Sequence, residues 1–238
     1  MSVREVYPDR HLRLPSRREG PAEALVILLH GVGSSAHAMA PAAQAISLGL
    51  GHAAVVALNA VEPFDLGQSG FQWFSVAGVT EANRAQRVAE ALQHVEAMIE
   101  SECARANVSH ERTAVVGFSQ GAVMALHLLV ASQRPPKAIV SWAGRLALPL
   151  QCTRNILASI LLSHGNSDPV IPVSELEFAA TKLRAIGCSV QTELVAAHGH
   201  SIHRNQLESS IRFLSSHLQA YDSYPGPKPR GHSSHGTV

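Results

Sequence analysis

The stretch from Arg112 to Ala131 (RTAVVGFSQGAVMALHLLVA) constrains the fold more than any other part of the chain. It begins with a short apolar, β-branched run, Thr113–Val116, which is typical of a buried strand. It ends with Ala122–Ala131, a run rich in Ala, Leu and Met that predicts a buried helix. The pentapeptide GFSQG, residues 117–121, joins the two. A G-x-S-x-G turn between a strand and a helix is the context in which a nucleophilic serine is presented.

The two glycines of this turn explain its chemistry. Without side chains, Gly117 and Gly121 let the helix fold back against the strand while the turn holds Ser119 in a strained conformation. The serine hydroxyl would then lie over the N-terminus of a helix, whose dipole favours negative charge. We therefore predict Ser119 as a nucleophile; the alternative is an ordinary glycine-rich strand-to-helix turn.

Composition and charge favour a globular protein and argue against nucleic-acid-binding and membrane-spanning classes. The chain has 238 residues, of which 46% are hydrophobic and 16% charged, as expected for one globular domain with a sizeable core. The net charge is +1 and no basic run is present, which gives no electrostatic case for nucleic acid or acidic membranes as partners. No apolar stretch reaches the roughly 18 residues that a membrane span requires. Residues 1–220 are predicted to form a single domain, and residues 221–238 a disordered or loosely packed tail.

The cysteines and the first residues indicate the compartment. Cys103, Cys152 and Cys188 are an odd number without metal-type spacing, which favours free thiols in a reducing environment. The first residues, MSVREVYPDR, lack the apolar segment of a signal peptide. These features predict a cytoplasmic protein without a cofactor. The oligomeric state stays open, and a homodimer is compatible with the sequence.

Predicted strands alternate with predicted helices along the chain. The strands are expected at Ala24–His30, His52–Leu58, Thr113–Val116, Ala138–Ser141, Ile156–Leu162 and Ser189–Val195, with an edge strand or two before residue 22. The helices are expected within His37–Leu50, at Glu81–Ala106, after Ser174 (where Ser174-x-x-Glu177 has the pattern of a capping box) and around Leu207–Leu218. This order predicts an α/β fold with a mostly parallel central sheet and helices on both faces. The connection Trp142–Arg154 is too short for a separate lid domain, whereas Asn59–Thr80 is a long loop rich in aromatic residues.

A serine hydroxyl needs a base to take its proton and a third group to orient that base. In α/β proteins of this kind the chain order is Ser, then acid, then His, so the acid should follow Ser119. Among the acidic residues downstream, only Asp168 sits just after a strand end in a turn that carries Gly and Pro. We predict Asp168 as the acid; the alternative is a turn-forming role, which Asp also favours.

Several histidines follow Asp168, and two of them fit the position of the base. His198 and His200 both lie just past the last predicted strand, and placement alone does not separate them. The group His198, His200 and His203 also raises the alternative of a metal site. No carboxylate or cysteine is near in sequence, so no metal is expected.

The oxyanion formed in acyl transfer needs backbone N–H donors that are fixed in advance. The N–H of Gln120, directly after the nucleophile, is one predicted donor. The N–H of Val32, in the loop after the first core strand, is the other. His30 precedes Ser119 in the chain, so we expect it to brace that loop rather than act as a base.

These segments resemble the carboxylesterase/phospholipase branch of the α/β-hydrolases, the group that includes acyl-protein thioesterases. The matching segments run from Leu28 to about Leu218 and are LLHGVGSS, GFQWFSVAGVTEANR, VVGFSQGAVMALHLL, LLSHGNSDPVIPV and AHGHSI. The WFS segment with the downstream T-E-x-N-R is similar to a bacterial esterase subgroup. Two positions depart from the family pattern: Ser34 stands where Asp or Asn is usual, and His198 where Leu or Met is common.

The resemblance implies a role for each matching residue. Ser119 matches the nucleophile, Asp168 the acid, and His200 the base, which selects His200 over His198. Val32 and Gln120 match the oxyanion donors, and Trp73 and Phe74 match an aromatic pair that walls the acyl or alcohol pocket, with loop anchoring as the alternative.

The implied activity is hydrolysis of carboxylic, short-chain esters on small-molecule or acyl-protein substrates, through an acyl-enzyme intermediate. Acyl-protein thioesterase or lysophospholipase activity is the enzymatic alternative. A binding module without catalysis is the alternative of another class.

Overall fold

The computed structural model describes residues 10–147, 150 and 158–220, and its core is a seven-stranded sheet. In spatial order the strands are β1 (Leu12–Leu14), β3 (Ala53–Leu58), β2 (Ala24–Leu29), β6 (Thr113–Phe118), β7 (Ala138–Trp142), β8 (Ser159–Gly165) and β9 (Ser189–Val195). Strand β1 pairs with β3 in the antiparallel direction, and all other pairs are parallel. The predicted mostly parallel sheet is confirmed, with the short antiparallel strand at one edge.

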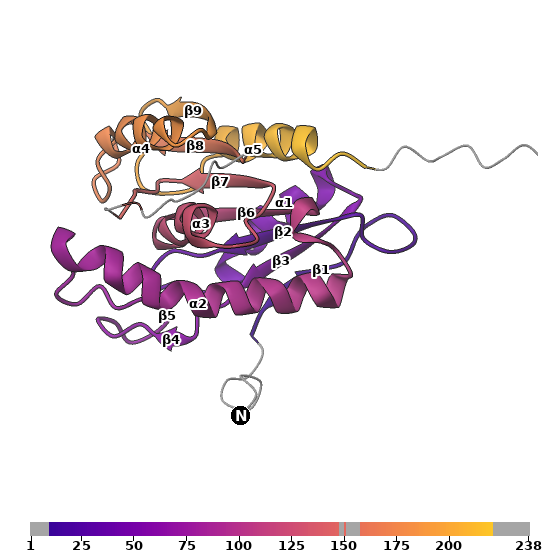
Figure 1. Ribbon diagram of the computed structural model, residues 1–238, viewed down its shortest axis with the longest axis horizontal. Helices are drawn as coiled ribbons and strands as arrows, with labels where there is room; N and C mark the ends of the chain where they lie inside the picture. Colours follow the sequence, from indigo (N-terminus) through magenta and orange to yellow (C-terminus); the bar gives the residue numbers. More distant parts are fainter. Residues whose placement is uncertain (1–9, 148–149, 151–157, 221–238) are drawn as a thin grey trace, which may run out of the picture.

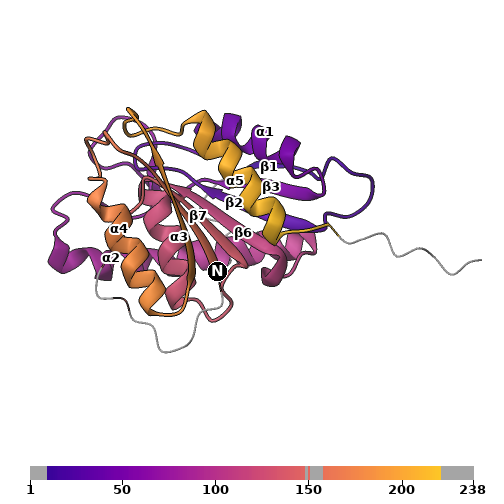
Figure 2. The same cartoon turned by 90° about the horizontal axis from the view of Figure 1, so that it is seen from above.

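Helices cover both faces of the sheet (Figures 1 and 2). The elements are α1 (Ala40–Gly49), α2 (Glu81–Ala106), α3 (Gln120–Ala131), α4 (Ser174–Ala185) and α5 (Arg204–His217), with short 3₁₀ turns η2 (His37–Met39) and η3 (His110–Arg112). Helices α2, α3 and α4 lie on one face, and α1 and α5 on the other (Figure 2). Successive residues of a strand point to opposite faces, so β2 is apolar throughout because both of its faces are buried.

Three local features differ from the sequence-based expectation. The loop 59–80 contains a small antiparallel hairpin of β4 (Glu62–Pro63) and β5 (Phe71–Gln72). Strand β8 extends to Gly165 instead of ending at Leu162, because its pairing with β9 continues that far. The N-cap of α4 is Val173, without a side-chain hydrogen bond, so the predicted capping box at Ser174 is wrong.

Some predictions concern residues that the structure does not describe. The predicted tail at 221–238 lies outside the described residues, as does most of the second half of the predicted connection between β7 and β8. Over the described ranges, no lid domain separate from the sheet and its helices is present. No helix in those same ranges is both long enough and apolar enough to cross a bilayer.

A very close backbone approach occurs at the N-terminus of α3. A Cβ atom added to Gly121 would lie 2.2 Å from the carbonyl oxygen of Leu29, at the end of β2. A Cβ atom on Gly117, at the end of β6, would lie 2.3 Å from the carbonyl oxygen of Gly121. Each obstructing atom belongs to the backbone of a buried element, so neither contact could relax by rotation of a side chain. Helix α3 reaches its position only because residues 117 and 121 are glycines.

Gly121→Ala is therefore expected to destabilise the protein by about 3 kcal/mol or more, the upper range for forced overpacking of a core. Urea unfolding followed by circular dichroism measures the change. Gly51→Ala is the matched control, because a Cβ atom there would meet only the Cβ of Arg17, at 4.0 Å. Equal stability of the two variants would contradict the close approach.

His127 is a buried histidine in the apolar helix α3. Its Nε2 atom accepts a hydrogen bond from the backbone N–H of Ala147 at 2.9 Å, which requires a neutral ring nitrogen. Burial lowers the pKa of His127 from 6.5 to about 4. Between these two pH values the unfolded chain binds a proton at this position and the folded chain does not. Folding stability is therefore lost as the pH falls from 6.5 towards 4.

The contribution of His127 to this loss is about 2–3 kcal/mol between pH 7.5 and pH 4.5. The free energy of unfolding of the wild type should fall between pH 7.5 and pH 4.5. For His127→Gln the decrease over the same interval should be smaller by about 2–3 kcal/mol. Urea unfolding at both pH values measures the difference. His94→Gln, at an exposed position of α2, is the control and should retain the wild-type pH dependence.

Candidate active site

Ser119 stands at the turn between β6 and α3. Its φ of +53° lies in the left-handed region that non-glycine residues rarely adopt, and its backbone N–H donates to the carbonyl oxygen of Trp142 at 2.9 Å. It is the N-cap residue of α3, so its hydroxyl lies at the positive end of that helix. This strained backbone, held by the neighbouring strand, is the geometry that the pentapeptide predicts.

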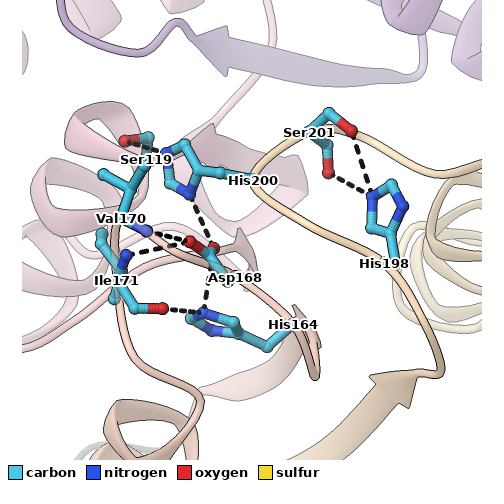
Figure 3. A network of polar contacts seen from close by, with 8 residues as sticks. All are labelled: Ser119, His164, Asp168, Val170, Ile171, His198, His200 and Ser201. Atoms are coloured by element: carbon cyan, nitrogen blue, oxygen red, sulfur yellow. Dashed lines mark hydrogen bonds and ion pairs between the residues drawn. The ribbon is translucent and has the colours of Figure 1, made fainter.

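His200 contacts Ser119, and Asp168 contacts the other side of the His200 ring (Figure 3). The Nε2 atom of His200, in the loop after β9, lies 2.9 Å from the Ser119 Oγ atom. The Nδ1 atom of the same ring lies 2.6 Å from Oδ2 of Asp168, in the turn after β8. The parallel order of β6, β8 and β9 brings these three residues to one edge of the sheet. In this arrangement Nδ1–H donates to the carboxylate, and Nε2 is free to accept the serine proton.

The surroundings of Asp168 keep its carboxyl group ionised. The side chain has no exposed surface, and such burial by itself raises a carboxyl pKa. Hydrogen bonds outweigh the burial: His200 binds Oδ2, and the N–H groups of Ile171 and Val170 donate to Oδ1 at 2.9 and 2.8 Å. The net effect lowers the pKa of Asp168.

His164 is a neighbour of Asp168 that the sequence did not indicate. Its Nε2 atom lies 2.9 Å from the carbonyl oxygen of Ile171 and 3.3 Å from Oδ2 of Asp168 (Figure 3). Both neighbours are acceptors, so Nε2 carries the hydrogen. The only available signal was the strand end itself, SHGNSD, and that pattern does not distinguish a buried contact from a turn.

His198 points away from the other site residues. Its Nε2 atom contacts the carbonyl oxygen of Ser201 at 2.8 Å (Figure 3). Its ring packs edge-on against His203, with 4.8 Å between the ring centroids. Of the two candidate bases, the structure brings only His200 to Ser119. Across residues 10–147, 150 and 158–220, no three His, Cys, Asp or Glu side chains gather as a metal site would require.

The loop that carries Val32 packs beside Ser119. A Cβ atom on Gly31 would lie 3.3 Å from the Cβ atom of Ser119, so the loop is in contact with the turn at residues 117–121, which we call the elbow. Two backbone hydrogen bonds fix the loop to β5: Gly33 donates to Phe71, and Phe71 donates to Ser34, each at 2.8 Å. The other predicted donor, the N–H of Gln120, lies in the first turn of α3, where helix N–H groups have no partner within the helix.

The buried side chain of His30 holds this loop in place. Its Nδ1 atom donates to the carbonyl oxygen of Gly31 at 2.7 Å, and its Nε2 atom accepts from the N–H of Ala60 at 3.1 Å. Burial lowers the pKa of His30 to about 4, partly offset by the Gly31 bond. The ring is thus neutral near pH 7 with both nitrogens engaged, which agrees with a structural role.

Trp73 and Phe74 are buried at the back of the site. The Nε1–H group of Trp73 donates to the carbonyl oxygen of His30 at 2.8 Å. Both residues line a cavity of about 400 Å³ that continues along α2 as far as Met98. Ser119, Asp168 and His200 do not line this cavity. The pair therefore lies between the loop of His30 and Val32 and the cavity, a position compatible both with a pocket wall and with loop anchoring.

Comparison with known proteins gives the same family as the residue patterns. Residues 16–218 match the family model described as phospholipase/carboxylesterase. The chain is 33% identical over 194 residues to esterase YpfH of Escherichia coli (strain K12), covering 82% of this chain and 83% of that protein.

Solved structures agree on the fold. The chain resembles the crystal structure of esterase PE8 with a TM-score of 0.82 and 29% identity, covering 89% of this chain and 100% of the other. The carboxylesterase of Bacillus cereus shares the fold, with a TM-score of 0.75 and 16% identity over 90% of this chain and 96% of that one. These matches confirm the predicted α/β-hydrolase fold and the predicted class of enzyme, a carboxylesterase. The protein belongs to the phospholipase/carboxylesterase family.

Proposed function

We propose that the protein is a serine esterase that hydrolyses short-chain carboxylic esters through the triad Ser119, His200 and Asp168. The observation that carries this proposal is the chain of contacts from Ser119 Oγ to His200 Nε2, at 2.9 Å, and from His200 Nδ1 to Asp168, at 2.6 Å. Both distances lie within hydrogen-bond range, as nucleophile activation requires. The family membership supplies independent support.

The reaction proceeds in two steps. His200 removes the proton of Ser119 as the oxygen attacks the ester carbonyl, and the N–H groups of Val32 and Gln120 bind the oxyanion. The imidazolium then gives its proton to the departing alcohol, which leaves an acyl-enzyme. Water, deprotonated by His200, attacks the acyl carbonyl and releases the carboxylic acid and Ser119. Asp168 orients the imidazole and stabilises its positive charge throughout.

The wall at Trp73 supports the preference for short acyl groups. Trp73 is 5% exposed and is held by hydrogen bonds from both its indole and its backbone N–H groups, so it is not free to rotate away. The cavity behind it, against α2, is not lined by the catalytic residues. A long acyl chain would need that space to be joined to the site. A homodimer and a cytoplasmic location remain predictions of the sequence.

Substitutions in the triad test the mechanism. Ser119→Ala and His200→Ala should each lower kcat by up to about 10⁶-fold, and Asp168→Asn by about 10⁴-fold, without unfolding the protein. Hydrolysis of p-nitrophenyl acetate and labelling by a fluorophosphonate probe measure the losses. His198→Ala is the matched control, because its imidazole contacts Ser201 and His203 instead. An active His200→Ala beside an inactive His198→Ala would refute the assignment of the base.

A chain-length series tests the substrate class. With p-nitrophenyl esters from acetate to palmitate, we expect kcat/KM to be greatest at two to four carbons and to fall by at least about tenfold by eight carbons. The wall at Trp73 would exclude the additional methylenes, and each one excluded from a pocket changes kcat/KM by about tenfold or more. A preference for eight or more carbons, or for a thioester over the matching ester, would favour the acyl-protein thioesterase or lysophospholipase alternative.

A further inference from the structure

The side chain of Gln120 is buried beside the nucleophile, yet the proposed mechanism uses only its backbone N–H. Gln120 is 5% exposed and both ends of its carboxamide are engaged. Its Oε1 atom accepts a hydrogen bond from the backbone N–H of Trp73 at 2.9 Å. Its Nε2 atom donates to the carbonyl oxygen of Phe74 at 2.7 Å. One side chain therefore satisfies two buried backbone groups of consecutive residues, 47 and 46 positions earlier in the chain.

These two bonds connect the wall of the site to the nucleophile elbow. The segment Trp73–Phe74 belongs to the loop between β3 and α2 and has no strand partner at these two residues. Its indole end is bonded to His30, next to the loop of one proposed oxyanion donor. Its backbone is bonded to Gln120, the residue of the other donor. The wall is thus tied to both segments that would hold the oxyanion.

We propose that the Gln120 side chain is a positioning and specificity-determining residue of the esterase reaction. The side chain fixes the distance between the Trp73–Phe74 wall and the backbone N–H of Gln120. When the acyl or alcohol group of the ester rests on this wall, the ester carbonyl is held against the oxyanion donors. The inference depends on the proposed esterase mechanism and adds the group that couples substrate fit to oxyanion binding. The Gln120 side chain acts on the substrate through Trp73 and Phe74, whereas the backbone N–H of the same residue contacts the oxyanion.

Alternatives to a carboxamide at this position fail for physical reasons. Satisfying an N–H and a C=O of adjacent residues requires one acceptor and one donor on the same planar group; among side chains with the length and shape of Gln, only the amide itself or the protonated carboxyl of Glu supplies both. A methionine of similar length would fill the space and leave both backbone groups buried without partners. Because the proposed oxyanion donor is the backbone N–H, every substitution at position 120 other than proline retains it. Such a substitution therefore tests the hydrogen bonds of the side chain while the backbone donor stays in place.

The first test is Gln120→Met, with wild-type turnover and fluorophosphonate labelling of Ser119 established beforehand. We expect kcat/KM for the best ester to fall about 10²-fold, the size of effect expected from misplacing a substrate by about 1 Å. We also expect the acyl-length preference to flatten. His52→Leu is the control for stability alone, because it removes a buried hydrogen bond to the carbonyl oxygen of Leu218, away from the site. Its kcat/KM and its length preference should equal those of the wild type.

The second test, Gln120→Glu, gives a readout that a loss of stability cannot produce. A protonated carboxyl group would restore both bonds, accepting from Trp73 and donating to Phe74, whereas the carboxylate would repel the Phe74 oxygen. Burial raises the pKa of an introduced carboxyl group. The neighbouring ionisable groups are His30, neutral near pH 7, which stacks on Trp73 at 5.1 Å, and Arg87, which binds the carbonyl oxygens of Ser75 and Ala77.

We therefore expect the ratio of variant to wild-type kcat/KM to be near one at the acidic end of the accessible range and to fall about 10²-fold as the pH rises. If Gln120→Met does not fold, this pH-dependent ratio decides alone. A folded Gln120→Met with wild-type kcat/KM and length preference, or a ratio for Gln120→Glu that does not change with pH, would overturn the inference. A wild-type protein that neither hydrolyses esters nor takes the label would instead refute the proposed function on which it rests.

Discussion

The contact on which the site depends is the backbone approach between the first turn of α3 and the ends of β2 and β6. Gly121 lies against the carbonyl oxygen of Leu29, and Gly117 lies against that of Gly121, with no space for a side chain at either position. This approach places Ser119, the proposed nucleophile, beside the loop that follows β2, so one contact positions both Ser119 and the Val32 loop. A displaced helix would move Ser119 and the N–H of Gln120 together, away from that loop.

Histidines in this region are distinguished by their surroundings. Burial lowers the pKa of His30 to about 4, which keeps its ring neutral and suited to hold two backbone groups. His200 is partly exposed, with a side chain at 15%, and faces an ionised carboxylate that can compensate a positive charge. In the proposed mechanism the His200 ring gains and loses a proton and needs that compensation, whereas a ring that only holds backbone groups must avoid the charge. The two roles therefore follow from burial and from the partner of each ring.

Much of this arrangement could be predicted from the sequence, because its strongest signals are local. Apolar runs, glycines and strand ends gave the parallel sheet, the elbow and Asp168 as a candidate acid. The choice between His198 and His200 could not be made locally, since both follow the same strand and only the direction of the loop separates them. The capping box at Ser174 was wrong because the chain enters α4 one residue earlier, at Val173, in a helical conformation. The end of β8 was misplaced because pairing with β9 extends it past the apolar run.

Contacts between side chains and distant backbone groups were beyond prediction for a different reason. The bonds of Gln120 to residues 73 and 74 and the contact of His164 with Asp168 leave no periodicity or composition in the sequence. Their partners are backbone groups or a residue already explained by another role. Every residue has backbone N–H or C=O groups. A motif therefore shows which side chain is present, but not which backbone groups that side chain binds. In GFSQG the serine alone is enough to account for the motif. The role of the glutamine side chain becomes apparent only in the structure, where it binds the backbone of Trp73 and Phe74.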